Sequence, residues 1–287
     1  MGAMTTSSYQ PWSTQPTGKE LLHATWALLK KDRELIWLPV LGTVFGLLSA
    51  IVLFAPGFGI GYAAGSTQAG FVIGAALAGV GTTFVGVFFT AALMIGANQR
   101  ADGGDPTLRG VLAVAWTKRL RILQWSLLSA TVGFVIRALE QRLGIIGKLL
   151  GFLGGVAWAI ATFLVVPVLI AEDLAPVDAV KRSSALLKQT WGTSLRSTLR
   201  FGFVQLLVML PALLGIVVGV LLAATGSTIG IALGILLIVA GIIALLGATM
   251  VFTAITGYAR ALIYRYATNQ PVPGIDGQLF AGAFRVK

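Results

Sequence analysis

The residues that could carry out chemistry are few, and the densest group is three carboxylates. Glu172, Asp173 and Asp178 follow an apolar segment closely. Such carboxylates could act as a general acid and base or hold a metal ion, if they converged on one pocket at the membrane surface. The same positions suit a helix start, where the positive end of the helix dipole favours acidic side chains. We expect the helix-start role and predict no catalytic residue.

Other chemistry is excluded by what the chain lacks. It has no cysteine and a single histidine, His23, so neither a transition-metal site nor a histidine-based triad is expected. Asp102 and Asp105 in the DGGDP turn fall short of the six or more oxygens that calcium needs. No P-loop, HExxH or GxSxG pattern occurs. We therefore expect no enzyme activity, no bound metal and no cofactor.

Apolar segments dominate the chain instead. Of its 287 residues 56% are hydrophobic and 11% are charged, whereas a soluble domain has about 25% charged residues. The apolar runs reach the roughly 20 residues that cross a bilayer as a helix. The sequence predicts an all-α, polytopic transmembrane helical bundle with six spans, at 36–54, 69–97, 120–139, 145–171, 199–224 and 228–258. Pro39, Pro167 and Pro211 mark expected kinks.

The spans form one predicted membrane domain, 19–268. Residues 1–18 are expected to be a flexible segment whose MGAM start resembles a tag remnant, and 269–287 a cytoplasmic tail. Eighteen of the 21 Lys and Arg residues fall on one side of the spans, and only Arg137, Arg142 and Lys148 fall on the other. Because basic residues are retained inside, both termini should be cytoplasmic. The net charge of +11 thus reports topology, and we predict no nucleic-acid partner.

A short motif precedes the odd-numbered spans. It reads PTGKELLHATW at 16–26, PTLRGVLAVAW at 106–116 and PVDAVKRSSALLKQTW at 176–191. Each copy begins with Pro, which suits a first helical turn, and Asp105 could cap the second. Each has an apolar and a polar face, which is typical of an amphipathic helix in the headgroup layer. We therefore predict three hairpin repeats, each preceded by a cytoplasmic interfacial helix.

Basic residues near this surface should attract anionic lipid headgroups, at about 1 kcal/mol each. The predicted contacts are Lys30, Lys31, Arg33, Lys118, Arg119, Arg121, Lys181 and Arg182. No charged residue lies near the middle of a span, which speaks against an ion-coupled transporter.

Glycines are abundant, with 36 copies. Spaced four apart in a span, they form a smooth stripe that lets two helices approach closely. Such spacing occurs at Gly57, Gly61 and Gly65, at Gly70 and Gly74, and at Gly215 and Gly219. The packing positions that we single out are Gly42, Gly46, Gly151, Gly155, Gly226, Gly230 and Gly234. The stripes could pack helices within one chain, join chains into a homo-oligomer or line a pore.

Three stretches resemble a bacterial family known as domain of unknown function 6159. They are WALLKKDRELIWLPVL at 26–41, WSLLSATVGFVIRALEQRLG at 125–144 and VVPVLIAEDLAPVDAVKRSSALLKQTWG at 165–192; IYRYATNQPVPG at 263–274 is similar too. The resemblance implies a six-span protein of the bacterial inner membrane and supplies no activity or functional residue.

Two functions fit these observations. The first is a non-enzymatic scaffold, or lipid-organising protein, that acts through its basic cytoplasmic rim. The alternative is a passive channel or transporter for a neutral or apolar solute, built from the glycine stripes, as a monomer or an oligomer.

Overall fold

The computed structural model describes residues 32–191, 195–268 and 270. Most of these residues are helical, and no strand occurs among them. The elements in chain order are the 3-10 turn η1 (Arg33–Ile36), α2 (Trp37–Ala63), α3 (Thr67–Ala101), α4 (Leu108–Thr117), α5 (Arg119–Arg142), α6 (Gly144–Ala161), α7 (Val165–Glu172), α8 (Pro176–Trp191), α9 (Leu195–Ala223) and α10 (Thr228–Ala267).

Six helical segments of the described chain are long and apolar enough to cross a membrane. They are Glu34–Ala63, Thr67–Ala101, Arg119–Arg142, Ile146–Glu172, Gln205–Ala223 and Thr228–Arg265. The predicted all-helical architecture with six membrane-crossing segments is confirmed at this level. The chain is a membrane-embedded protein by the length and composition of its helices.

The fourth segment is not one continuous helix. A turn at 162–164 separates α6 from α7, and the buried Ser183 on α8 accepts a hydrogen bond from the Leu164 backbone N–H (N to Oγ, 3.1 Å). Pro39 and Pro167 lie at the third positions of α2 and α7, in the first turn, where proline is tolerated best. The kinks predicted at Pro39 and Pro167 stay predictions. Pro211 does lie inside α9.

Consecutive long helices pack as antiparallel pairs, α2 with α3, α5 with α6 and α9 with α10. Close approach depends on glycine at two of these contacts. A Cβ on Gly57 would lie 2.7 Å from the Gly74 Cα, and one on Gly219 would lie 2.7 Å from the Gly234 carbonyl oxygen. Both distances are shorter than real Cβ contacts. Glycine spacing thus sets the separation of the helices in these pairs.

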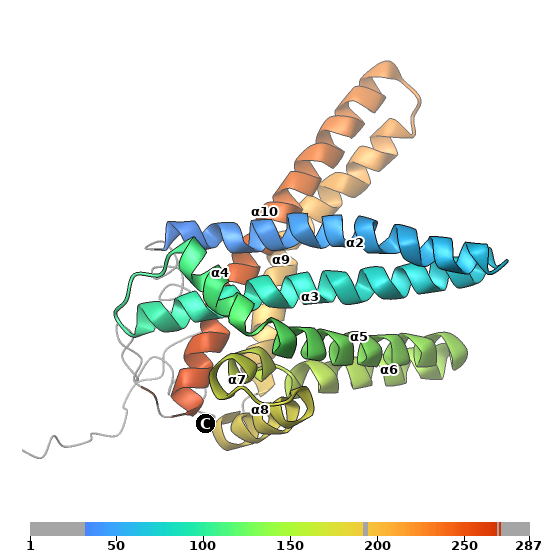
Figure 1. Cartoon of the computed structure of the whole chain (residues 1–287). Coiled ribbons are helices and arrows are strands. Elements are labelled where there is room, and N and C mark those ends of the chain that lie inside the picture. Colours follow the sequence, from blue (N-terminus) through green and yellow to red (C-terminus); the bar gives the residue numbers. More distant parts are fainter. Residues whose placement is uncertain (1–31, 192–194, 269, 271–287) are drawn as a thin grey trace, which may run out of the picture.

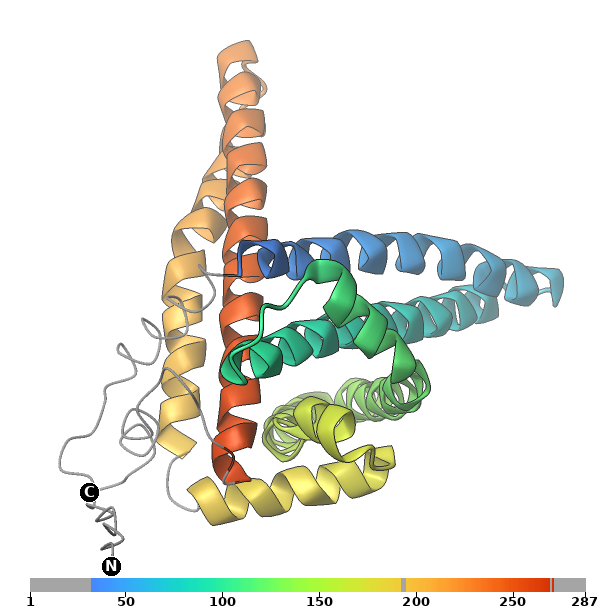
Figure 2. The ribbon, with the colours of Figure 1, turned by 60° about the vertical axis from the view of Figure 1, so that its left-hand side comes forward.

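The three pairs point in different directions. In Figure 2 the α2–α3 pair extends to the right and the α9–α10 pair extends upward, while the α5–α6 pair is seen nearly end-on. In Figure 1 the α5–α6 pair lies below α3, and Phe134 of α5 faces Gly79 of α3. The pairs therefore diverge from a common end and separate toward their tips.

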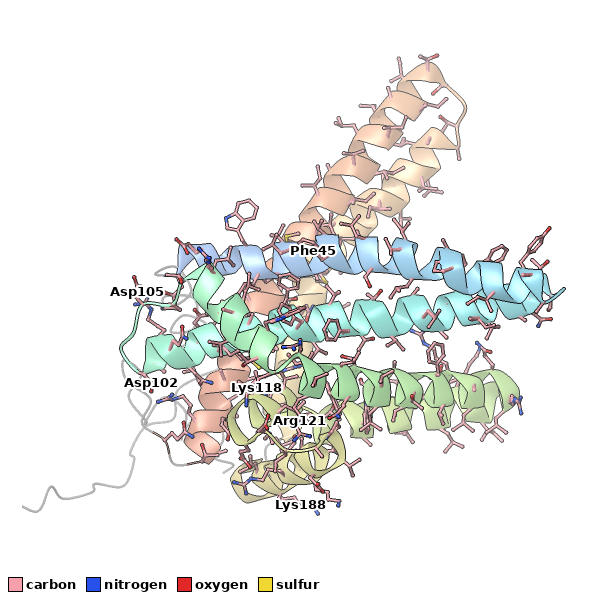
Figure 3. All side chains as sticks on the ribbon, in the orientation of Figure 1. Phe45, Asp102, Asp105, Lys118, Arg121 and Lys188 are labelled. Carbon is pink, nitrogen blue, oxygen red and sulfur yellow. The ribbon has the colours of Figure 1, made fainter. Side chains whose placement is uncertain are left out.

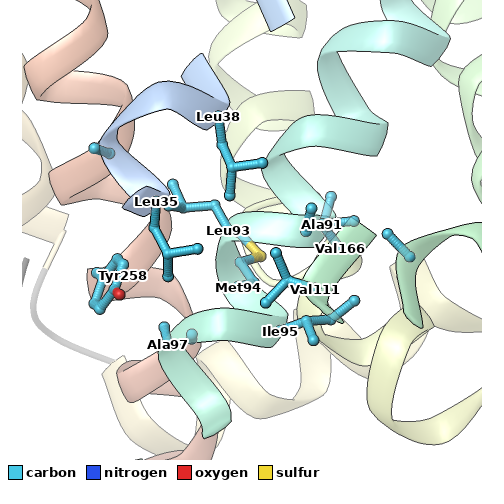
Figure 4. Packing of buried hydrophobic residues seen from close by; sticks show 14 of the residues in the cluster. Leu35, Leu38, Ala91, Leu93, Met94, Ile95, Ala97, Val111, Val166 and Tyr258 are labelled. Atoms are coloured by element: carbon cyan, nitrogen blue, oxygen red, sulfur yellow. The ribbon is translucent and has the colours of Figure 1, made fainter. Parts of the chain in front are cut away.

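The main hydrophobic core lies at that common end. Leu35 and Leu38 pack there with Leu93 and Met94 of α3 and with Tyr258 of α10, as Figure 4 shows. Farther out the helices are mostly exposed: only 6% of the apolar stretch in Gln205–Ala223 is buried. Outside the core, lipid must supply most of the apolar contact of a membrane-embedded chain.

Candidate functional site

The ionic side chains that Figure 3 labels lie away from the tip of the α2–α3 pair, in the part of the molecule where the pairs meet. We call this part, which contains Asp102, Asp105, Lys118, Arg121 and Lys188, the charged end. The last third of α10 passes through it and is largely buried between Ala254 and Tyr264. Two polar networks hold α10 to the rest of the chain.

The Asp32 network consists of Asp32, Arg100, Asp105 and Tyr258. The Asp32 side chain is fully buried. The Arg100 guanidinium donates to Asp32 Oδ1 (from Nε, 2.8 Å) and the Tyr258 hydroxyl donates to Asp32 Oδ2 (2.7 Å). Arg100 also donates to the exposed Asp105 (Nη2 to Oδ1, 2.6 Å). Both oxygens of the buried carboxylate are thus hydrogen-bonded, which offsets the cost of burying its charge.

The Glu172 network consists of Glu172, Arg182 and Tyr264. The Arg182 Nε lies 3.2 Å and 3.1 Å from the two carboxylate oxygens of Glu172. The Tyr264 hydroxyl donates to Oε1 of the same carboxylate (3.0 Å). In both networks a tyrosine from α10 and an arginine therefore donate to the same carboxylate, and the Asp32 network has Asp105 as a second carboxylate. A third link joins α10 to the end of α3, because Arg265 Nη2 donates to Asp102 Oδ1 (2.6 Å).

The three carboxylates considered for chemistry do not share a partner. Glu172 binds Arg182 and Tyr264, Asp173 binds Lys118, and Asp178 binds Lys181 (Nζ to Oδ1, 3.2 Å). In the described part of the chain, no three His, Cys, Asp or Glu side chains are grouped as metal ligands would be. Glu172 and Asp173 therefore form ion pairs with residues of other helices, whereas Asp178 pairs within α8.

The turn between α4 and α5 forms a basic corner, which we define as Trp116, Lys118, Arg119, Leu120 and Arg121. Its two apolar side chains are exposed, Trp116 by 56% and Leu120 by 64%. The Arg119 guanidinium lies over the Trp116 ring, 5.3 Å from its centroid, and Arg119 Nη1 donates to the Trp116 carbonyl oxygen (3.1 Å). Cation and aromatic ring thus lie together on an exposed surface.

One carboxylate faces this corner. Asp173 Oδ1 accepts a hydrogen bond from Lys118 Nζ (3.1 Å) and lies 3.8 Å from Arg121 Nε. The hydrogen bond from Lys118 and the two positive charges hold the pKa of Asp173 below its usual range. Asp173 therefore partly neutralises Lys118 and Arg121, whereas no described carboxylate lies within ion-pair distance of Arg119.

The other predicted lipid contacts have varied surroundings. Lys181 is 75% exposed and pairs with Asp178, and Arg182 belongs to the Glu172 network. Arg33 lies on η1. Lys30 and Lys31 fall outside the described residues, as does the first copy of the Pro-to-Trp motif at 16–26.

The predicted cap of the second motif is wrong. The N-cap of α4 is Thr107, whose hydroxyl accepts a hydrogen bond from the Gly110 N–H (3.2 Å). Asp105 binds Arg100 instead. A threonine at the position after Pro106 competes for the cap because its hydroxyl also satisfies a free N–H of the first turn.

The seven singled-out glycines differ in their contacts. A Cβ on Gly42 would lie 3.2 Å from the Phe89 Cβ, and one on Gly46 would lie 3.8 Å from Thr82. Gly234 packs against Gly219 and Ala223, Gly230 against the turn at Thr225, and Gly151 against the Glu140 side chain. Gly155 faces open space, and Gly226 has a positive φ (72°) in the turn between α9 and α10.

Asp32, Tyr258 and Tyr264 are residues that sequence reasoning passed over. The sequence offers one signal for a polar contact here: two tyrosines lie six residues apart near the end of a long apolar run. Tyrosine combines an apolar body with a hydroxyl group that usually needs a hydrogen-bond partner when it is buried. Their carboxylate partners are too distant in the chain to be found by spacing.

A pocket of about 360 Å³ lies beside the charged end, between α2, α3 and α10. Its lining combines hydroxyl-bearing, glycine and apolar residues: Pro39, Gly42, Thr43, Gly46, Leu47, Thr82, Gly86, Phe89, Thr90, Leu93, Thr249, Met250 and Thr253. The pocket is formed where α10 leaves the α2–α3 pair.

Comparison with known proteins gives a family and no activity. The sequence model of the Family of unknown function (DUF6159) matches residues 69–273. Searches of curated proteins and of solved structures found no match. Because the matched region spans more than half of the chain, this protein belongs to the Family of unknown function (DUF6159).

Proposed function

We propose that this protein is a non-enzymatic membrane protein that organises anionic lipid at its charged end. The observation that carries the proposal is the basic corner. Its three cations are opposed by one carboxylate, Asp173, and they lie beside two exposed apolar side chains. Tryptophan next to lysine and arginine suits the boundary between acyl chains and headgroups. Each basic residue there attracts anionic lipid by about 1 kcal/mol.

The proposed orientation places the charged end in the cytoplasm of a bacterial cell, at the inner membrane. The excess of Lys and Arg on this side supports it. We further propose that the three antiparallel pairs are repeats of one unit, and that α4 and α8 are its interfacial helices. The buried Val111 and Ala115 of α4, with the exposed Trp116 next to them, support an interfacial position for α4.

The test is lipid selectivity of the full-length protein in nanodiscs of mixed phosphatidylglycerol and phosphatidylcholine. We expect K118Q/R119Q/R121Q to reduce the enrichment of phosphatidylglycerol around the protein by at least about tenfold, because three contacts of ~1 kcal/mol are removed. The matched control is R137Q/R142Q/K148Q, which removes the same charge near the turn between α5 and α6. Equal enrichment in wild type and the first variant would overturn the proposal.

A second candidate function is passive passage of a neutral or apolar solute. The pocket between α2, α3 and α10 favours it, because no charged side chain lines that pocket. Passage predicts release of a neutral solute such as glycerol from proteoliposomes, and absence of protein-dependent release would exclude that solute. The exposed faces of the α9–α10 pair leave room for a homo-oligomer, which we propose as the assembly for this candidate and which mass measurement in detergent tests.

A further inference from the structure

The pocket between α2, α3 and α10 has an unusual polar character. Five of its lining residues are threonines, and none of its lining residues is charged. Four of these hydroxyls donate to a carbonyl of their own helix, four residues back: Thr43 to Pro39 (2.9 Å), Thr82 to Ala78 (2.8 Å), Thr90 to Gly86 (2.8 Å) and Thr249 to Leu245 (2.7 Å). Their O–H groups are therefore in use, and what remains toward the pocket is the acceptor side of each oxygen.

The pocket lies at a defined depth. On α2 its lining begins at Pro39, in the first turn, and reaches Leu47. At 1.5 Å per residue this corresponds to roughly the first 15 Å of the helix, counted from the charged end. That depth is about half of a hydrocarbon core of ~30 Å. The pocket is thus level with the acyl chains of the leaflet next to the charged end.

The surroundings also determine how a ligand could enter. The α2–α3 and α9–α10 pairs diverge from this point (Figures 1 and 2). Among the lining residues, Leu47 on α2 is 63% exposed, and Thr249 and Thr253 on α10 are exposed as well. A molecule dissolved in the bilayer can therefore enter from the side, between the two pairs.

We propose that this pocket binds an uncharged lipid that carries a hydroxyl group, of the class of a diacylglycerol or a long-chain alcohol. A charged ligand would lose its hydration without gaining a counter-charge. A hydroxyl donor would satisfy the free acceptor side of the threonine oxygens, while Phe89, Leu93 and Met250 contact the chain. The volume is near the lower limit of ligand pockets, roughly 300–1,000 Å³, and suits the hydroxyl end of such a lipid with part of one chain.

This inference goes beyond both proposed functions, since it needs neither the basic corner nor passage across the membrane.

The experiment uses full-length protein in neutral phosphatidylcholine nanodiscs. The probe is a long-chain alcohol with a diazirine near its hydroxyl. The comparison compound is the methyl ether of the same molecule, which has no hydrogen-bond donor. After irradiation, labelled peptides are mapped by mass spectrometry. We expect the alcohol to label α2, α3 and α10 around the pocket about fivefold more than the ether, because a site that accepts a hydrogen bond discriminates against a ligand without a donor.

Two variants with matched controls locate the site. Gly86 lines the pocket, and a Cβ added to it would meet nothing within 4 Å, so G86L fills the pocket without displacing a helix. The control is G247L on α10, where the space is equally open but outside the lining. We expect G86L to reduce labelling about tenfold and G247L to leave it unchanged.

The second variant, T90V/T249V, removes two hydroxyls at nearly constant volume. The control is T83V, because Thr83 makes the same hydrogen bond on α3 (to Gly79, 2.7 Å) but does not line the pocket. T90V/T249V should bring alcohol and ether labelling close together, while T83V keeps the difference. The proposal is overturned if G86L labels like wild type, if alcohol and ether label wild type equally, or if labelling spreads evenly over all exposed helices.

Discussion

The Tyr258 hydroxyl donates a hydrogen bond of 2.7 Å to Asp32, 226 residues earlier in the chain. Both residues are buried, and the bond joins the last third of α10 to the segment that leads into the first long helix. Together with Arg100 it leaves neither oxygen of the Asp32 carboxylate without a donor. The bond therefore helps to hold α10 against the start of α2 at the charged end, beyond which the two helices diverge (Figure 1).

The first prediction concerns this bond. Y258F removes the hydroxyl and leaves one oxygen of a buried carboxylate without its donor, which should lower the free energy of unfolding by about 1–3 kcal/mol. Thermal unfolding in detergent measures the effect. The control is Y62F, since Tyr62 is 64% exposed near the tip of the α2–α3 pair and its change should leave the transition in place. An equal shift for both variants would contradict the role of the bond.

The second prediction concerns the coupling of Asp32 and Arg100. R100Q leaves the buried Asp32 carboxylate without its cation, and D32N leaves Arg100 with only the exposed Asp105. Removing one partner of a fully buried pair costs about 3–5 kcal/mol, and because the Arg100 side chain is 23% exposed we expect losses toward the lower end of that range. The double variant D32N/R100Q should lose clearly less than the sum of the two single losses. Additive losses in a double-mutant cycle would show that the two side chains do not interact.

Local properties of the sequence determine only part of this fold. The six apolar segments were predictable because a run of apolar residues is a local property. The break at 162–164 was not, because the free N–H of Leu164 is satisfied by Ser183, which belongs to another helix. The partners of Asp32 were out of reach for the same reason: spacing along the chain gives no information about a contact over 226 residues.

The charged end was predicted in part. The clustering of Lys118, Arg119 and Arg121 follows directly from the sequence. That Asp173 faces two of them depends on how α7 packs near the start of α5, which no local pattern encodes. The expected helix-start position is confirmed for Asp178, which lies in the first turn of α8 and pairs with Lys181 three residues later. Glu172 and Asp173 instead pair with residues of other helices, Arg182 and Lys118.

The third prediction concerns the glycine contacts. Gly61 packs against the backbone of Gly70, whereas Gly59, two residues away on α2, faces open space. G61A should force α2 and α3 apart at their tips and lower the thermal midpoint in detergent. G59A should leave the midpoint unchanged or raise it slightly, because alanine favours a helix over glycine by about 1 kcal/mol. Equal behaviour of the two variants would show that the approach at Gly61 does not determine the packing.

The fourth prediction concerns pH and the basic corner. The pKa of Asp173 lies below its usual range because of Lys118 and Arg121. A lowered carboxylate pKa means that these ion pairs are present at neutral pH and are lost as the pH falls through the lowered value. Because the ordinary pKa of a carboxyl group is about 4 and that of Asp173 is lower, acidification well below about pH 4 should free both cations and increase phosphatidylglycerol enrichment in the nanodisc assay. D173N should show the high enrichment already at pH 7 and little change on acidification. D178N is the matched control. It frees only Lys181, which lies on α8 and not at the basic corner, so this variant should keep the wild-type pH dependence. Identical pH profiles for wild type and D173N would mean that Asp173 does not control the charge of the corner.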